Sequence, residues 1–153
     1  MTRIHSVYLS GRAVLFVSFV NQTVALEASG DDGALEEQTD EYVANPNSEL
    51  VAASSNSEFL IQVYGSSIHV LDLLTKTKFQ EFVPSSRILG AVTLNENIYC
   101  FDELNYIRCY RVNAMSRLIE SEHNIESESA MICLAMFTNA LGYELIKLEI
   151  LHV

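Results

Sequence analysis

The sequence is poor in residues that interrupt regular structure, and it carries few basic side chains. Only two prolines and six glycines occur among 153 residues, which excludes a linker protein or a fibrous one. Hydrophobic residues make up 49% and charged residues 19% of the chain, a composition typical of a globular domain with a real core. The formal net charge is −11. We therefore expect no binding to nucleic acid or to an anionic membrane through bulk charge.

Cysteine is also scarce, and its spacing excludes two further classes. Cys100, Cys109 and Cys133 are odd in number and form no CxxC pair, which argues against a disulfide framework and against a zinc site. We expect buried or half-buried thiols in a reducing compartment.

The sequence lacks the short motifs that usually mark an enzyme. It contains no GxSxG, no glycine-rich phosphate loop, no HExxH and no Cys/His cluster. The histidines are scattered, and the paired carboxylates Asp102 and Glu103 fall in a predicted hairpin turn, where acidic residues are ordinary. We predict no catalytic residues, no cofactor and no metal site.

No apolar run is long enough to span a membrane as a helix. The longest candidate, residues 14–20, is interrupted by Ser18 and falls short of the ~20 residues required. A signal peptide is the alternative, because Arg3 and Arg12 precede this run, but no small-residue cleavage pattern follows it. We expect strands here, no membrane association, and a location in the nucleus or cytoplasm.

Strand signals begin near the N-terminus and are then interrupted by an acidic segment. Residues 4–27 are predicted to form two or three strands, because a β-branched and aromatic run lies between two turn signals. Residues 28–48 are crowded with carboxylates, and no lysine or arginine occurs between Arg12 and Lys76. This segment favours a solvated loop, with an acidic arm for a basic partner as the alternative.

From residue 49 the pattern becomes regular and then recurs. Four short strands with tight turns are predicted at 50–54, 59–63, 68–73 and 78–82. Sliding the sequence so that Leu50 falls on Leu89 keeps strands and turns in phase, and it also pairs Asn56 with Asn95, Phe59 with Ile98 and Ile68 with Ile107. A third unit is expected to open at 130–136. Four strands recurring at a period of about 40 residues indicate propeller blades, which bury their faces by stacking on one another.

One segment of the repeat resembles a known family. "IHVLDLLTKTKFQ", residues 68–80, resembles the third-to-fourth strand segment of a WD40 repeat, with Leu71 at the tryptophan position and Asp72 at the aspartate position. The resemblance implies that Asp72 supports hydrogen bonds within its blade. His69 is expected to be exposed or at a blade edge. The next unit departs from the pattern with Tyr110 and Arg111, and the Gly-His pair of many such repeats is absent.

A narrower likeness depends on the order of features and on "VAASSNSEFLIQV" and "LNENIYCFDELNYIRCYRV". In these the chain is similar to the non-catalytic WD-repeat subunit of tRNA (guanine-N7) methyltransferases. The resemblance implies a scaffold that stabilises an S-adenosylmethionine-dependent catalytic subunit in tRNA processing. It implies that tRNA is contacted only indirectly or weakly.

Basic residues gather in the repeated part of the acidic chain. The candidates for binding a protein partner are Arg87, Arg108, Arg111 and Arg117. Arginines at a blade edge pair well with carboxylates or phosphates, whereas solvated strand ends and turns are the alternative.

The sequence as a whole predicts an all-β fold, an incomplete WD40-like β-propeller of about three four-stranded antiparallel blades. The expected divisions are first degenerate blade strands (1–27), an acidic loop insertion (28–48), a blade (49–86), a blade (87–124), and a partial blade with a divergent tail (125–153). The tail at 141–153 fits either two short strands or an amphipathic helix. A protein-binding scaffold is the predicted function; a generic WD40 adaptor and a ligand-binding antiparallel β-barrel are the alternatives.

Overall fold

The computed structural model describes residues 3–9, 11–29, 33–113, 119–126, 133–138 and 144–149. Nearly all regular structure within them is β-strand. The elements, in chain order, are β1 (Arg3–Leu9), β2 (Arg12–Phe19), β3 (Gln22–Ser29), β4 (Ala34–Glu37), α1 (Thr39–Tyr42), β5 (Leu50–Ser55), β6 (Phe59–Tyr64), β7 (Ile68–Asp72), β8 (Lys78–Phe82), β9 (Ile88–Leu94), β10 (Asn97–Asp102), β11 (Tyr106–Val112), β12 (Ile119–Glu126), β13 (Cys133–Thr138) and β14 (Glu144–Glu149).

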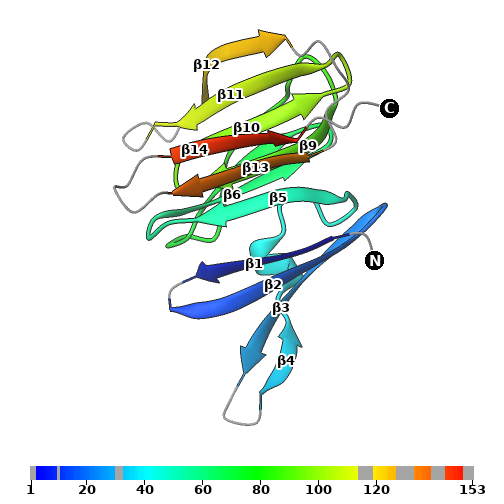
Figure 1. Ribbon diagram of the computed structural model, residues 1–153. Coiled ribbons are helices and arrows are strands. Elements are labelled where there is room, and N and C mark those ends of the chain that lie inside the picture. The colour runs from blue at the N-terminus through cyan, green and yellow to red at the C-terminus, as the bar shows by residue number, and fades with distance from the viewer. Residues whose placement is uncertain are drawn as a thin grey trace.

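The strands form consecutive antiparallel sheets in chain order. The first three sheets have four strands each, β1–β4, β5–β8 and β9–β12, and β13 pairs with β14 (Figure 1). The predicted strands near 50–54, 59–63, 68–73 and 78–82 are confirmed as β5 to β8. The shift that brings Leu50 onto Leu89 carries each of them onto the corresponding strand of β9–β12. The repeat seen in the sequence is therefore a structural repeat.

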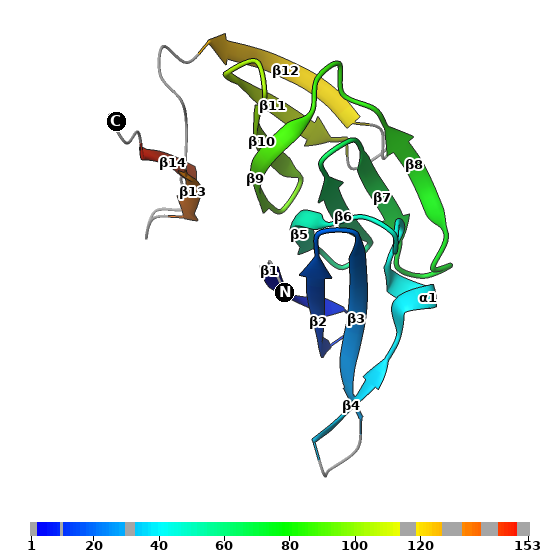
Figure 2. The ribbon, with the colours of Figure 1, turned by 90° about the vertical axis from the view of Figure 1, so that its right-hand side faces the viewer.

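The sheets are arranged as the blades of a propeller. Strands β1, β5, β9 and β13, the first of each sheet, lie beside one another in succession, and Figure 2 shows them near the centre with β4, β8 and β12 at the periphery. The predicted all-β propeller of about three four-stranded blades is confirmed. The alternative of a closed barrel is wrong, because the described strands divide into separate sheets instead of one continuous wall.

The core lies in two layers between blades. Alternate residues of a strand point to opposite faces of its sheet, and the second blade is covered on both faces, so every residue of β6 and β7 is buried. One layer joins the first and second blades through Leu9, Phe16, Leu60 and Tyr64. The other joins the second and third through Phe59, Ile61, Ile98 and Val112. Each such side chain contributes about 1.5–3 kcal/mol when fully buried.

The expectation of a solvated loop at residues 28–48 is wrong for much of this segment. It contains β4, which pairs with β3, and α1. The short apolar stretch that follows α1 docks between the first two blades: Val43 joins their shared core, and the Ala44 N–H donates to Gln62 Oε1 at 2.9 Å. The acidic residues of the segment lie outside that stretch, which explains why its average composition predicts a loop.

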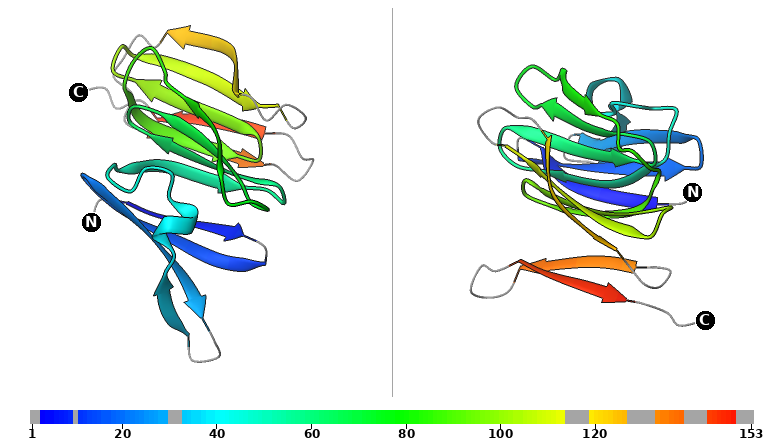
Figure 3. Two further views of the ribbon diagram at one scale, coloured as in Figure 1. Left: turned by 180° about the vertical axis from the view of Figure 1, so that it is seen from behind. Right: turned by 90° about the horizontal axis from the view of Figure 1, so that it is seen from above.

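The C-terminal part contains a hairpin. Strand β14 resolves the two alternatives for the tail in favour of strand at Glu144–Glu149. The unit expected to open at 130–136 is represented by β13, while 127–132, 139–143 and 150–153 lie outside the described residues. Figure 3 (right) shows the hairpin as a separate layer beside the third blade. No helix in the described part of the chain is long and apolar enough to cross a membrane.

Candidate partner-binding groove where three blades meet

Turns of three blades gather at one face of the propeller. In antiparallel sheets that follow chain order, successive turns alternate between the two ends of the strands. The β2–β3, β6–β7 and β10–β11 turns therefore share one face with the segments that connect β4 to β5 and β8 to β9. A groove of about 610 Å³ opens on this face; we call it the three-blade groove, and it is lined by Arg3, 20–21, 47–49, Val51, 65–66, 83–89 and Glu103.

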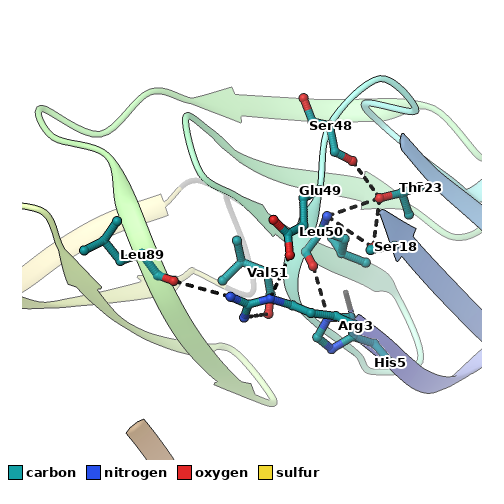
Figure 4. Close-up of polar contacts among 9 residues, drawn as sticks. All are labelled: Arg3, His5, Ser18, Thr23, Ser48, Glu49, Leu50, Val51 and Leu89. Atoms are coloured by element: carbon teal, nitrogen blue, oxygen red, sulfur yellow. Dashed lines mark hydrogen bonds and ion pairs between the residues drawn. The ribbon is translucent and has the colours of Figure 1, made fainter. Parts of the chain in front are cut away.

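Arg3 joins three blades at the wall of the groove. From β1 its Nε donates to Glu49 Oε1 at 3.1 Å, and its terminal nitrogens donate to the carbonyl oxygens of Val51 at 3.2 Å and Leu89 at 3.4 Å (Figure 4). Glu49 and Val51 belong to the second blade and Leu89 to the third. The guanidinium therefore fixes the relative positions of the blades, and its charge is neutralised by Glu49.

Hydroxyl groups fix the start of the second blade against the first. The Leu50 N–H lies 3.2 Å from Ser18 Oγ and 3.1 Å from Thr23 Oγ1, and the Thr23 hydroxyl donates to the Ser48 carbonyl at 2.6 Å (Figure 4). His5 Nε2 lies 3.2 Å from the Leu50 carbonyl oxygen. Burial lowers the pKa of His5, against the opposing effect of that hydrogen bond. This side of the groove is therefore held by buried and part-buried polar contacts.

Arg87 differs from Arg3 in its environment. Its backbone N–H donates to Glu103 Oε1 at 3.2 Å, and its carbonyl accepts from the Glu103 N–H at 3.0 Å. Its side chain lies over Gly65, where an added Cβ would sit 3.6 Å from the Arg87 Nε. Among the described residues no carboxylate forms an ion pair with the exposed Arg87 guanidinium. The groove thus presents one positive charge that no described carboxylate neutralises.

Comparison with family models gives a match over the whole chain. The model described as the RSE1/DDB1/CPSF1 second beta-propeller matches residues 1–153. The chain belongs to this family. No curated protein matches it. The family assignment and the stacked blades agree on a propeller of the scaffold or interaction type.

Two other predicted site residues, Arg108 and Arg111, lie outside the groove. Arg108 donates from Nε to Asp102 Oδ2 at 2.6 Å inside the third blade and stacks near the Tyr106 ring. Arg111 is exposed on β11, and Arg117 lies outside the described residues. Of the three described candidates, only Arg87 lines the groove, and partner binding by any of the four stays a prediction.

Sequence reasoning missed Arg3 as a groove residue. Its contacts are 46 to 86 residues away along the chain, and no local pattern marks such an arrangement. One signal was available. Arg3 directly precedes the first predicted strand, and the first strands of consecutive propeller sheets lie next to one another at the centre.

Asp72 and Asp102 each stabilise the turn that follows them, because their carboxylates accept hydrogen bonds from backbone N–H groups of that turn. Asp72 Oδ1 accepts from the N–H groups of Leu74 at 2.9 Å and Thr75 at 2.8 Å, which confirms the expected structural role of Asp72. Asp102 accepts in the same way from the N–H groups of Leu104 and Tyr106, both at 2.9 Å, and from the Ser86 hydroxyl.

His69 is buried, contrary to the expectation of an exposed or blade-edge position. The side chain is 1% exposed, because the face opposite Ile68 is covered by the first blade. Its Nε2 lies 2.8 Å from Ser67 Oγ, and its ring packs edge-on against Tyr64. Burial lowers its pKa, as does Lys78, against the opposing effect of Glu81. This histidine belongs to the interblade core.

The thiols and potential metal ligands give no sign of chemistry in the described part of the chain. Cys100 and Cys109 are buried, as predicted, and neither forms a disulfide with a described cysteine. Burial raises the pKa of the Cys100 thiol. No group of three His, Cys, Asp or Glu side chains capable of holding a metal occurs among the described residues. What the groove offers is a binding surface of mixed polar and aliphatic character.

Proposed function

We propose that the chain is a non-catalytic scaffold that holds a protein partner against the three-blade groove. The observation that carries this proposal is the groove itself, where Arg3 contacts three blades and where exposed aliphatic side chains share the lining with an Arg87 guanidinium that pairs with no carboxylate of the described residues. Its volume falls in the range of specific binding sites, ~300–1,000 Å³. Membership of a propeller family of the interaction type supports a binding role.

Site-specific photo-crosslinking tests the location of the partner. A photoreactive amino acid replaces Val83 in the groove or, as the matched control, Leu74 in the β7–β8 turn at the opposite end of the strands. Both side chains are exposed. We expect a protein crosslink from position 83 and none from position 74 in the cells that produce the chain. Equal yields at both positions, or crosslinks to RNA alone, would contradict the proposal.

A narrower form of the proposal names the partner. It is the catalytic subunit of a tRNA (guanine-N7) methyltransferase, in the nucleus or cytoplasm, with the chain acting as its WD-repeat stabilising subunit. The motifs at residues 51–63 and 94–112 support it, whereas the matched family model names no methyltransferase. Co-purification is the test: the chain is expected to raise the stability and activity of such a subunit. Recovery in a different assembly, without a methyltransferase, removes this narrower form.

A further inference from the structure

The charged side chains of the three-blade groove differ in whether they already have an ion-pair or hydrogen-bond partner. Arg3 and Glu49 form an ion pair at 3.1 Å and neutralise one another. Glu103 is held by the backbone of Arg87 through two hydrogen bonds. The Arg87 guanidinium, in contrast, has no ion-pair partner among the described residues. A guanidinium presents a planar fork of donors that matches a carboxylate in a bidentate geometry.

Exposed aliphatic side chains line the same groove as this charge. Val83 is 68% exposed and Leu89 is 45% exposed, and both line the groove on either side of Arg87 along the chain. Val20 adds a third exposed aliphatic side chain from the first blade. Covering apolar surface of this kind stabilises a complex by about 25 cal/mol per Å². A matching ligand therefore carries aliphatic side chains close to its negative charge.

The surroundings disfavour a polyanion. Glu49 and Glu103 line the same groove, and the whole chain carries a formal net charge of −11. Successive phosphates of a nucleic acid would meet these carboxylates, whereas nucleic-acid sites neutralise many phosphates with Lys and Arg. A ligand with a single carboxylate in an apolar segment needs only one cationic partner, which Arg87 supplies, and it brings fewer negative charges near Glu49 and Glu103.

We propose that the three-blade groove binds a short extended segment of a partner protein, in which one Asp or Glu pairs with Arg87 and flanking aliphatic residues cover Val83 and Leu89. This inference rests on the proposed scaffold function and adds the chemistry of the bound segment. The groove volume of about 610 Å³ suits a few residues of a peptide better than a folded domain.

Peptide binding to the full chain provides the test. The probe is a short fluorescein-labelled peptide with one aspartate between two valine–leucine pairs, and its matched versions replace the aspartate by asparagine or lysine. Binding is measured by fluorescence anisotropy. We expect the aspartate peptide to bind, and Arg87→Glu to weaken it by about tenfold or more, since charge-assisted pairs are stronger than neutral hydrogen bonds. Arg111→Glu, an equally drastic change at an exposed arginine outside the groove, is expected to leave affinity within about twofold.

A charge exchange separates a direct contact from an indirect one. The Arg87→Glu protein is expected to bind the lysine peptide better than the wild-type protein does. Three outcomes overturn the inference: no binding of the aspartate peptide, equal effects of the Arg87 and Arg111 substitutions, or Arg87-dependent binding of a short single-stranded RNA in its place. If the crosslink from position 83 to a protein persists in any of these cases, the scaffold function stands and only the chemistry assigned to its ligand fails.

Discussion

At the scale of single residues, Asp102 of the third blade accepts several hydrogen bonds at once through its carboxylate. Its side chain is 1% exposed and accepts from Arg108, Ser86 and the backbone of the β10–β11 turn. Burial by itself would raise its pKa, but these hydrogen bonds outweigh burial and hold the pKa below its usual value. The contribution of the ionised carboxylate to stability is therefore present above its unfolded pKa of ~4, and it is lost as the pH falls from there through the folded pKa.

Replacing Asp102 tests how much its hydrogen bonds stabilise the fold. Asp102→Asn leaves the Arg108 charge partly buried without its partner, and we expect the free energy of unfolding in urea to fall by about 3 kcal/mol. Glu36→Gln, an exposed carboxylate on β4, serves as the control with an expected change of less than about 0.5 kcal/mol. Similar losses for both variants would show that the Asp102 network does not stabilise the fold.

Two histidines, the buried His69 and the half-buried His5, predict loss of stability in mild acid. The pKa values of His5 and His69 are both lowered chiefly by burial, so the unfolded chain binds more protons than the folded chain below about pH 6.5. The groups facing His69 are Lys78, Glu81 and the Ser67 hydroxyl. Stability is therefore fully present above about pH 6.5 and falls as the pH drops toward the folded pKa values.

Urea midpoints at several pH values check this expectation. The wild-type midpoint is predicted to fall between about pH 7.5 and pH 5.5, and His69→Gln is predicted to reduce the slope, since it removes one of the two proton-binding groups. An unchanged slope in His69→Gln would show that His69 ionises alike in both states.

At the scale of elements, hydrophobic alternation and turn residues predicted the strands more accurately than average composition did. The strands of the second blade were predicted closely because alternation and turn residues agree there, as at Asn56, whose Oδ1 accepts from the N–H groups of Glu58 and Phe59. The segment at 28–48 was predicted as loop because its carboxylates dominate the average. Val43, 8% exposed, docks its end into the core, and that burial depends on the first two blades being in place.

Gly90 illustrates a constraint that belongs to a strand pair. It lies opposite Phe101 in the β9–β10 ladder, and a Cβ at position 90 would come within 2.1 Å of the Phe101 ring. We expect Gly90→Ala to cost about 1–3 kcal/mol of unfolding free energy through overpacking.

The double variant Gly90→Ala with Phe101→Leu provides the control. Because the two residues are in contact, their effects are expected to be non-additive, with a smaller cost of Gly90→Ala when the ring is absent. Additive costs would place the strain elsewhere.

At the scale of the whole molecule, the internal repeat that aligns Leu50 with Leu89 was sufficient to predict stacked sheets, because each sheet has two apolar faces that need cover. The groove was not predictable in the same way. Its lining comes from several short segments of three blades, and the Arg3 contacts join residues up to 86 apart in sequence. Charge clustering named Arg87 and Arg108 alike as candidates for binding a partner. The structure places Arg87 at the groove, whereas Asp102 holds Arg108 inside the third blade.

The most direct test of the stacked-blade architecture is a set of nuclear Overhauser contacts in solution. The account predicts methyl contacts between the facing sides of the second and third blades, such as Ile61 with Ile98, both of which belong to one core layer. It predicts no backbone ladder between β8 and β9, which end and begin separate sheets. A continuous series of backbone contacts from β8 to β9, as in a barrel wall, would contradict the blades and the groove built from them.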